Sequence, residues 1–442
     1  MPARRPPADP LPALAAWMGR HRARIFRLAL SGGLDSMALL EALLELRRRG
    51  GLPAPLACLH VHHGLRPEAG AWARLVAGRC AEAGLPCEVL RVRVDPGDPR
   101  GLEAAAREAR YAALAARLSP GEALLTGHHR DDQAETVLLQ LLRGAGPAGL
   151  AAMAGWRPFG PGRLGRPWLD LGWGRAELEA WARARGLGWV EDPTNRDPRH
   201  LRNRLRHELL PRLEALVPGA RRTLARAARL QAEAAALLEE LAAQDLERAA
   251  GPEGALRLEA LAALSEARRR NLLRHWLRLR GAPPLDERRL EELARWAGLR
   301  PDARPCLRWR GWELRRHRGL LRVRPVPPPL DPGLDLPWTP PEPLALPDGR
   351  RLCAEARPGG LRPGLGLRVR LRRGGERMVC KDNGMRRPLK KLLQEWGVPP
   401  WERERLPLLY AGEELAAVTG LGVAAPFRAP PGEAGWWPVV EG

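Results

Sequence analysis

The chain has 442 residues, more than one typical domain, and its 45% of hydrophobic residues allow each of two or three domains a core. Its formal net charge of +22 favours a polyanionic partner such as nucleic acid, although an arginine-rich proteome is an alternative explanation. No apolar run approaches a bilayer span, and the six cysteines form no CxxC pair. These features exclude a membrane-spanning protein and favour a cytoplasmic protein with reduced thiols.

Strand-like and helical patterns alternate from about residue 24 to residue 189. Four apolar runs, RIFRLAL, PLACLHVH, PCEVLRVRV and ALLTGH, are typical of strands, and each is followed by a helical pattern. This alternation predicts an α/β fold, a Rossmann-like, doubly wound parallel sheet with helices on both faces. Ligands of such sheets bind at the carboxyl ends of the strands.

Composition divides the chain into four segments, and residues 1–205 contain the strand–helix alternation. Residues 206–324 are rich in Ala, Leu, Arg and Glu at helical spacing, which predicts a basic helical domain. Residues 325–348 contain many prolines, which deny regular hydrogen bonding and favour an extended linker. Residues 349–442 contain the strand-like runs LRVRLR, LPLLY and LAAVTG, which predict a small α+β C-terminal domain.

The segment SGGLDS follows the first predicted strand and opens a helix. It consists of Ser31, Gly32, Gly33, Leu34, Asp35 and Ser36. The two glycines let the backbone approach a phosphate, and the amides of the helix N-terminus favour an anion. Asp35 would repel phosphate unless it holds Mg²⁺, so the loop predicts a metal-bound nucleotide. A Walker loop is excluded because no lysine precedes Lys381. A tight, capped strand–helix turn is the structural alternative.

The loop resembles the SGGxDS signature of the PP-loop ATP pyrophosphatases, and this resemblance implies Mg-ATP as the cofactor. Five further motifs occur in order: HVHHGLR at 60–66, AAAREARY at 104–111, TGHHRDDQAET at 126–136, LLRGAGPAGLAAM at 141–153 and WVEDPTNRDPRHLRNRLRHELLP at 189–211. Residues 386–423 resemble the C-terminal domain of the same family. Together these motifs resemble the tRNA(Ile)-lysidine synthetase family.

This resemblance implies a reaction in two steps. ATP adenylates the 2-oxo group of the wobble cytidine in tRNA(Ile) with a CAU anticodon, and L-lysine then displaces AMP. The resemblance implies that Asp132 and Glu135 hold the lysine, with His128 and Asp131 nearby. It also implies that Arg110 stabilises phosphate or developing charge and that Val61 lies at the nucleotide. The acidic cluster fits this chemistry, since a cationic amine needs anionic partners.

Basic residues in two regions are candidates for tRNA binding, so residues 206–324 and 349–442 are both expected to bind tRNA. The candidates are Arg202, Asn203, Arg204, Arg206, Lys390 and Lys391. Helical spacing puts Arg202 and Arg206 on one face and Arg204 on another, so the run cannot contact RNA all at once. A solvated basic helix is the alternative for any one of these arginines.

Several alternatives stay open at this point. Asp131 and Asp132 could simply cap a helix, and five histidines in the two His-rich motifs could bind zinc. GAGPAG at 144–149 matches GxGxxG but follows a helix, so a dinucleotide site fails its context test. Rival functions are a PP-loop tRNA sulfurtransferase, a small-molecule adenylating enzyme and a non-enzymatic RNA-binding protein. The sequence leaves the oligomeric state open, with a homodimer as one option.

Overall fold

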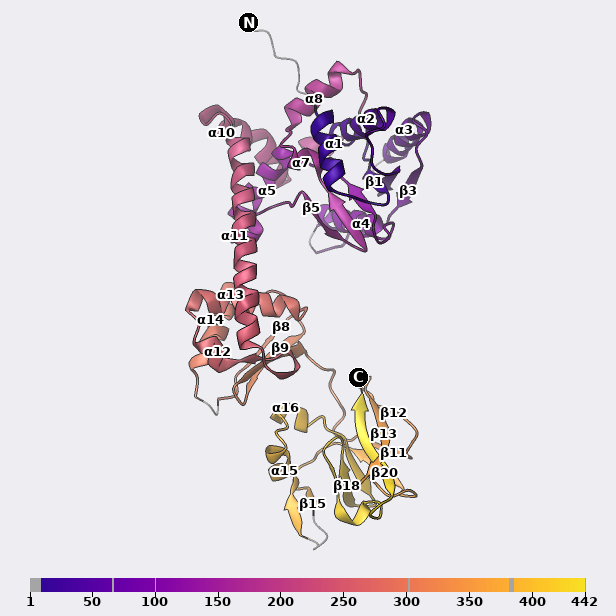
Figure 1. Ribbon diagram of the computed structural model, residues 1–442, viewed down its shortest axis with the longest axis vertical. Helices are drawn as coiled ribbons and strands as arrows, with labels where there is room; N and C mark the ends of the chain where they lie inside the picture. Colours follow the sequence, from indigo (N-terminus) through magenta and orange to yellow (C-terminus); the bar gives the residue numbers. More distant parts are fainter. Residues whose placement is uncertain (1–8, 66, 100, 301–302, 381–384, 442) are drawn as a thin grey trace. The chain divides into compact units, whose positions relative to one another are not determined.

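The computed structural model describes residues 9–65, 67–99, 101–300, 303–380 and 385–441 (Figure 1). The chain forms two compact units, residues 1–240 and 241–442. The predicted boundary at residue 205 therefore lies inside the first unit. Within the described ranges, no helix combines the length and apolar character needed to cross a membrane.

The first unit is built on a six-stranded sheet in the order β3-β2-β1-β4-β6-β5. The strands are β1 (Phe26–Ala29), β2 (Leu56–His62), β3 (Cys87–Arg91), β4 (Ala123–Leu125), β5 (Trp156–Phe159) and β6 (Gly162–Gly165). All pairs are parallel except β5 with β6. The predicted parallel sheet and its four predicted strands are confirmed. The β5–β6 hairpin was not predicted, because its strands are only four residues long and lie among prolines and glycines.

Helices cover both faces of this sheet. They are α1 (Leu11–Arg20), α2 (Leu34–Arg48), α3 (Ala69–Glu82), α4 (Leu102–Ala115), α5 (Arg130–Leu142), α6 (Pro147–Leu150), α7 (Pro167–Asp170) and α8 (Arg175–Ala184). A large apolar cluster packs α1, α2, α3 and α8 against β1, β2 and β4. A second cluster packs α4 with β2, β3, β4 and β6.

The chain then leaves the sheet through a run of helical segments. They are η1 (Pro193–Arg196), α9 (Leu201–Arg204), a π-helical turn η2 (Leu205–Leu209), α10 (Leu210–Leu216) and α11 (Ala220–Ala249). Leu205 and Leu210 are buried against Ala134 and Leu138 of α5. This small apolar contact lays the LRNRLR segment along the acidic face of α5. A π-helical turn is rare and is often found at functional sites.

The second unit continues with α12 (Leu258–Ala262), α13 (Glu266–Leu279), α14 (Glu287–Arg295), and the short η3 (Pro252–Gly254) and η4 (Trp296–Gly298). Strands β7 (Leu256–Arg257), β8 (Cys306–Trp309), β9 (Trp312–His317) and β10 (Leu320–Pro325) form an antiparallel sheet in the order β7-β10-β9-β8. The expectation of helix throughout residues 206–324 is therefore wrong after Gly298. Arginines occupy many positions of these strands and hide the alternation, while Gly311 and Gly319 form the hairpin turns with positive φ.

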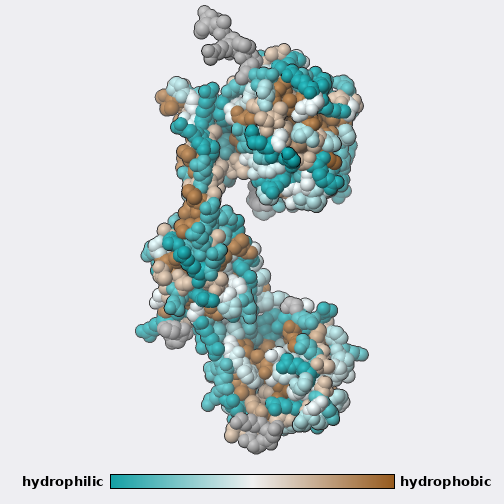
Figure 2. Space-filling view, in the orientation of Figure 1, coloured by the Kyte–Doolittle hydropathy of each residue, from teal (hydrophilic) through white to brown (hydrophobic). Residues whose placement is uncertain are grey.

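The C-terminal part of the second unit has the predicted α+β content. Its elements are β11 (Asp335–Trp338), β12 (Leu344–Ala345), β13 (Arg351–Pro358), β14 (Leu367–Arg370), β15 (Arg377–Val379), β16 (Arg386–Pro388), α15 (Leu389–Glu395), α16 (Pro400–Arg403), β17 (Leu408–Ala411), β18 (Glu414–Val418), β19 (Gly422–Val423), η5 (Ala425–Phe427) and β20 (Ala434–Glu441). Strand β11 pairs with β14, and β12 pairs with β13. The predicted linker at 325–348 is thus partly built into the C-terminal sheets. Figure 2 shows mainly hydrophilic side chains on the visible surface, as the composition requires.

Candidate active site

The phosphate loop joins β1 to α2 and is ordered by its two serines. The Ser36 hydroxyl donates to the Gly33 carbonyl at 3.0 Å and lies 3.0 Å from the Ser31 hydroxyl. Gly32 has φ +87°, a conformation that favours glycine. No side chain caps α2 at Gly33. The amides of Leu34 and Asp35, at the start of this 15-residue helix, therefore have no side-chain acceptor and could bind an anion.

The main chain at Asp35 is held closely by two other segments. A Cβ on Gly127, in the loop after β4, would lie 2.8 Å from the Asp35 carbonyl carbon and 2.9 Å from its oxygen. The indole nitrogen of Trp168 donates to the same oxygen at 3.1 Å. The glycine of TGHH is thus required for close approach, and it brings the β4–α5 loop against the phosphate loop.

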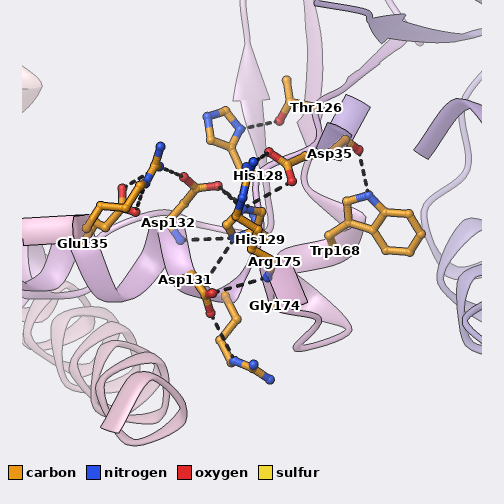
Figure 3. A network of polar contacts seen from close by, with 12 residues as sticks. Asp35, Thr126, His128, His129, Asp131, Asp132, Glu135, Trp168, Gly174 and Arg175 are labelled. Carbon is orange, nitrogen blue, oxygen red and sulfur yellow. Dashed lines mark hydrogen bonds and ion pairs between the residues drawn. The ribbon is translucent and has the colours of Figure 1, made fainter. Parts of the chain in front are cut away.

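His129 is the N-cap of α5 and directs its ring at two carboxylates (Figure 3). Its Nδ1 accepts from the backbone N–H groups of Asp131 and Asp132 at 3.2 and 3.3 Å. The neutral ring therefore carries its proton on Nε2, which lies 3.5 Å from both Asp35 Oδ1 and Asp132 Oδ2. The alternative that aspartates cap this helix holds in part, because the capping box joins Asp132 to His129.

Asp35 is the acidic group of the phosphate loop. Its Oδ1 is buried without a hydrogen-bond partner among the described residues, and its Oδ2 lies 3.6 Å from Nη1 of Arg175. Burial raises the pKa of Asp35, while His129 and Arg175 act in the opposite direction. A carboxylate oxygen that accepts no hydrogen bond, beside the uncapped start of α2, is the type of ligand that Mg²⁺ prefers.

The acids expected to hold lysine form a compact ion-pair cluster with two arginines. Glu135 is 1% exposed and accepts from Nε of Arg202 at 2.7 Å and Nε of Arg206 at 2.5 Å. Asp132 Oδ1 accepts from both guanidinium groups, at 3.0 and 3.1 Å. Burial acts to raise the pKa of Asp132, but the neighbouring histidines and arginines outweigh it and hold the pKa below its usual range.

This cluster gives two of the basic tRNA-binding candidates partners that the sequence did not predict. Arg202 and Arg206 were expected to bind tRNA, but they neutralise the two carboxylates expected to bind lysine. Asn203 is also turned inward, where its amide donates to the carbonyls of Thr194 and Asp197 at 2.8 and 2.9 Å. A buried side chain with both amide hydrogens bonded has a structural role in this conformation. Among the four candidates Arg202, Asn203, Arg204 and Arg206, only Arg204 is exposed, and it lies 3.8 Å from the carboxylate of Glu208.

Asp131 and His128, which the resemblance places near the lysine, each have partners of their own. Asp131 Oδ2 accepts from the backbone of Arg175 at 3.3 Å and lies 3.8 Å from Nε of Arg221. Asp131 therefore ties α5 to α8 and α11 and does not face Asp35. His128 Nδ1 lies 2.8 Å from the Thr126 hydroxyl. Burial lowers the pKa of His128 to about 3, so this ring is neutral near pH 7 and too weak a base to take a proton from an ammonium group.

The remaining predicted residues lie elsewhere on the two units. Arg110 is exposed on α4, where its charge acts on His60 and His63 at the end of β2. The side chain of Val61 is half-buried against the apolar cluster under α4. Lys390 and Lys391 are exposed on α15. Within the described ranges, no group of three His, Cys, Asp or Glu residues could hold a metal ion, so the zinc alternative finds no support.

Sequence reasoning missed two residues that contact the phosphate loop. Trp168 lies in α7 and Arg175 begins α8, more than 130 residues after Asp35. Neither stands in a motif with an evident chemical role, and no local pattern in the sequence predicts their contacts. Only the packing of α7 and α8 beside α2 brings these side chains to Asp35.

Comparison with known proteins agrees with this architecture over nearly the whole chain. A PP-loop domain family matches residues 12–213, a TilS substrate binding domain matches residues 256–322 and a TilS substrate C-terminal domain matches residues 367–441. The tRNA(Ile)-lysidine synthase of Alkalilimnicola ehrlichii is 48% identical over 92% of this chain and 91% of its own. The chain belongs to the tRNA(Ile)-lysidine synthase family.

Two further members of this family also match most of the chain. The tRNA(Ile)-lysidine synthase of Pseudomonas aeruginosa is 45% identical over 96% of this chain and 95% of its own, and that of Xanthomonas campestris is 45% identical over 88% and 89%. The chain is accordingly an ATP-dependent ligase of tRNA modification with a PP-loop ATP-binding domain. The predictions of family, fold class, reaction class and ATP use are confirmed.

Proposed function

We propose that this chain adenylates the wobble cytidine of tRNA(Ile) with a CAU anticodon and then joins L-lysine to it, and that the carboxyl edge of the first sheet performs both steps. The observation that supports this most is the contact of two motifs far apart in the sequence. The phosphate loop with Asp35 lies against the loop that begins α5, whose His129 faces both Asp35 and Asp132. The activating and the amine-binding groups are therefore neighbours.

The phosphate loop would bind the triphosphate through the amides at the start of α2. Asp35 would hold Mg²⁺ through Oδ1, which accepts no hydrogen bond from the residues that the structure describes. The ion, when bound, neutralises charge on the phosphates during their cleavage. Val61 would lie near the nucleoside at the end of β2, on the far side of β1 from β4.

His129 would position Asp35 and Asp132 without becoming a base itself. Its Nδ1 is occupied by two backbone N–H groups, and its Nε2–H points between the two carboxylates. His128 would donate or accept a hydrogen bond in its neutral form and would not remove the amine proton. The proton lost by lysine would pass to a carboxylate of the site or to water.

Lysine binding at Asp132 and Glu135 has a specific electrostatic requirement. The two carboxylates already face two guanidinium groups, so the four side chains carry no net charge together. A lysine ammonium would be attracted only after a guanidinium gives way or if it approaches Asp132 Oδ2, which faces His129. Arg202 and Arg206 would then act inside the site, while Arg204, Lys390 and Lys391 would contact tRNA phosphates from exposed positions.

The test is incorporation of labelled lysine into unmodified tRNA(Ile), with and without ATP. The variants are Asp35→Asn and Glu135→Gln, which keep side-chain volume. The control is Glu179→Gln, which removes a carboxylate of α8 that pairs with the exposed Arg183. We expect ATP-dependent labelling by the wild type and the control, and a fall of roughly 10²-fold or more in the two site variants. Absence of labelling by an intact, tRNA-binding wild type would refute the proposal and favour sulfur transfer, the nearest rival.

A further inference from the structure

Arg175 lies beside the phosphate loop, and its guanidinium has a distant ion-pair partner, Asp35. It is the first residue of α8, its side chain is 42% exposed, and its Nη1 lies 3.6 Å from Asp35 Oδ2 (Figure 3). Its backbone N–H donates to Asp131 at 3.3 Å, which fixes the start of the helix and the origin of the side chain. Its guanidinium donates no hydrogen bond to any residue that the structure describes.

The neighbouring cations are already occupied. Arg130 makes two hydrogen bonds to Glu177 and a third to the Gly172 carbonyl. The guanidinium groups of Arg202 and Arg206 are bonded to the carboxylates of α5. Because the phosphate loop has no lysine of its own, a triphosphate placed beside Asp35 needs a cation from another element.

We propose that Arg175 binds the pyrophosphate half of ATP during adenylation, an inference that rests on the proposed function. The bond between the α-phosphorus and its bridging oxygen breaks, and the cytidine oxygen forms the new bond to that phosphorus. The electron pair of the broken bond leaves with pyrophosphate. A guanidinium matches two oxygens of that leaving anion and stabilises the charge that it gains.

The sheet order indicates which half of the nucleotide Arg175 meets. Strand β1 lies between β2 and β4, and the phosphate loop follows β1. If the nucleoside lies at the end of β2 near Val61, the phosphates cross the loop towards β4. Asp35 contacts the loop after β4 through Gly127, and Arg175 is on this side of the loop. The guanidinium is therefore nearest the terminal phosphates.

Equilibrium binding of two probes to the full chain, magnesium pyrophosphate and AMP, tests this assignment. Arg175→Gln should weaken pyrophosphate binding by about ten- to hundredfold and leave AMP binding unchanged, whereas Arg175→Lys should lose less. The matched control is Arg183→Gln, which removes an exposed arginine of the same helix. Unchanged pyrophosphate binding in Arg175→Gln, or an equal loss of AMP, would overturn the assignment.

A second pair of variants separates direct contact from an effect through Asp35. In an Asp35→Asn background, the further change Arg175→Gln should still weaken pyrophosphate binding if the guanidinium contacts the anion. If the loss disappears in that background, Arg175 only positions Asp35 and the proposal fails. Lysine labelling of tRNA by the wild type is scored separately. If the wild type labels tRNA with lysine but Arg175→Gln binds pyrophosphate as the wild type does, only this inference is refuted. If the wild type does not label tRNA, the proposed function is refuted.

Discussion

Replacing Glu135 by alanine tests the ion-pair cluster that lies at the centre of the proposed site. The carboxylate is 1% exposed and accepts three hydrogen bonds of 2.5–2.9 Å from Arg202 and Arg206. Removing one partner of a buried ion pair costs about 3–5 kcal/mol. The two guanidinium groups are 26% and 24% exposed, so hydration recovers part of that energy. We expect a loss of about 2–3 kcal/mol.

The assay is hydrogen exchange of the full chain, followed by mass spectrometry of peptides from α5, Arg130–Leu142. A stability loss of about 2–3 kcal/mol should increase the rate of amide hydrogen exchange in α5 by roughly 30- to 150-fold, because exchange requires the helix to open. The control is Glu177→Ala, which removes a half-exposed partner of Arg130 and should cost less than about 1 kcal/mol. If Glu135→Ala exchanges no faster than this control, the cluster does not stabilise α5 and the reasoning is refuted.

Three other changes follow from the same structure. Gly127→Ala should displace the phosphate loop and weaken ATP binding at least tenfold, as measured by calorimetry. The control Gly78→Ala places its methyl group in open space and should bind ATP as the wild type does. Equal ATP binding by the two variants would contradict the close approach of Gly127 to Asp35. Burial lowers the pKa of His128 to about 3 from 6.5. Burying the neutral ring therefore costs no stability above pH 6.5, but the free energy of unfolding decreases as the pH falls from 6.5 towards 3. Urea unfolding at pH 7.0 and 5.5 should show that the wild type loses about 1.3 kcal/mol more than His128→Asn. Equal losses would contradict the lowered pKa of His128. Lys390→Gln and Lys391→Gln should each reduce the salt dependence of tRNA binding by about one unit of slope in filter binding, and an unchanged slope would show that these lysines meet no phosphate.

The sequence by itself determined the features that depend on short stretches of chain. The four predicted strands, the helix that opens at SGGLDS and the open amides at its start follow from apolar periodicity and glycine placement. These strands could be predicted because the apolar pattern that indicates a strand lies within the strand's own residues. Three later strands, at residues 306–325, escaped prediction because arginines fill many of their positions and mask the alternation.

Tertiary structure alone decided how the site residues are paired. Asp132 and Glu135 meet arginines 67 to 74 positions later, and Asp35 meets Arg175 and Trp168 from α8 and α7. Charge type and spacing could not predict these partners, because any of many arginines could neutralise the same acids. The apolar faces of α5 and of residues 201–210 are buried against each other, and this packing fixes how the two segments lie. The ion pairs then form between the charged groups that the packing brings together.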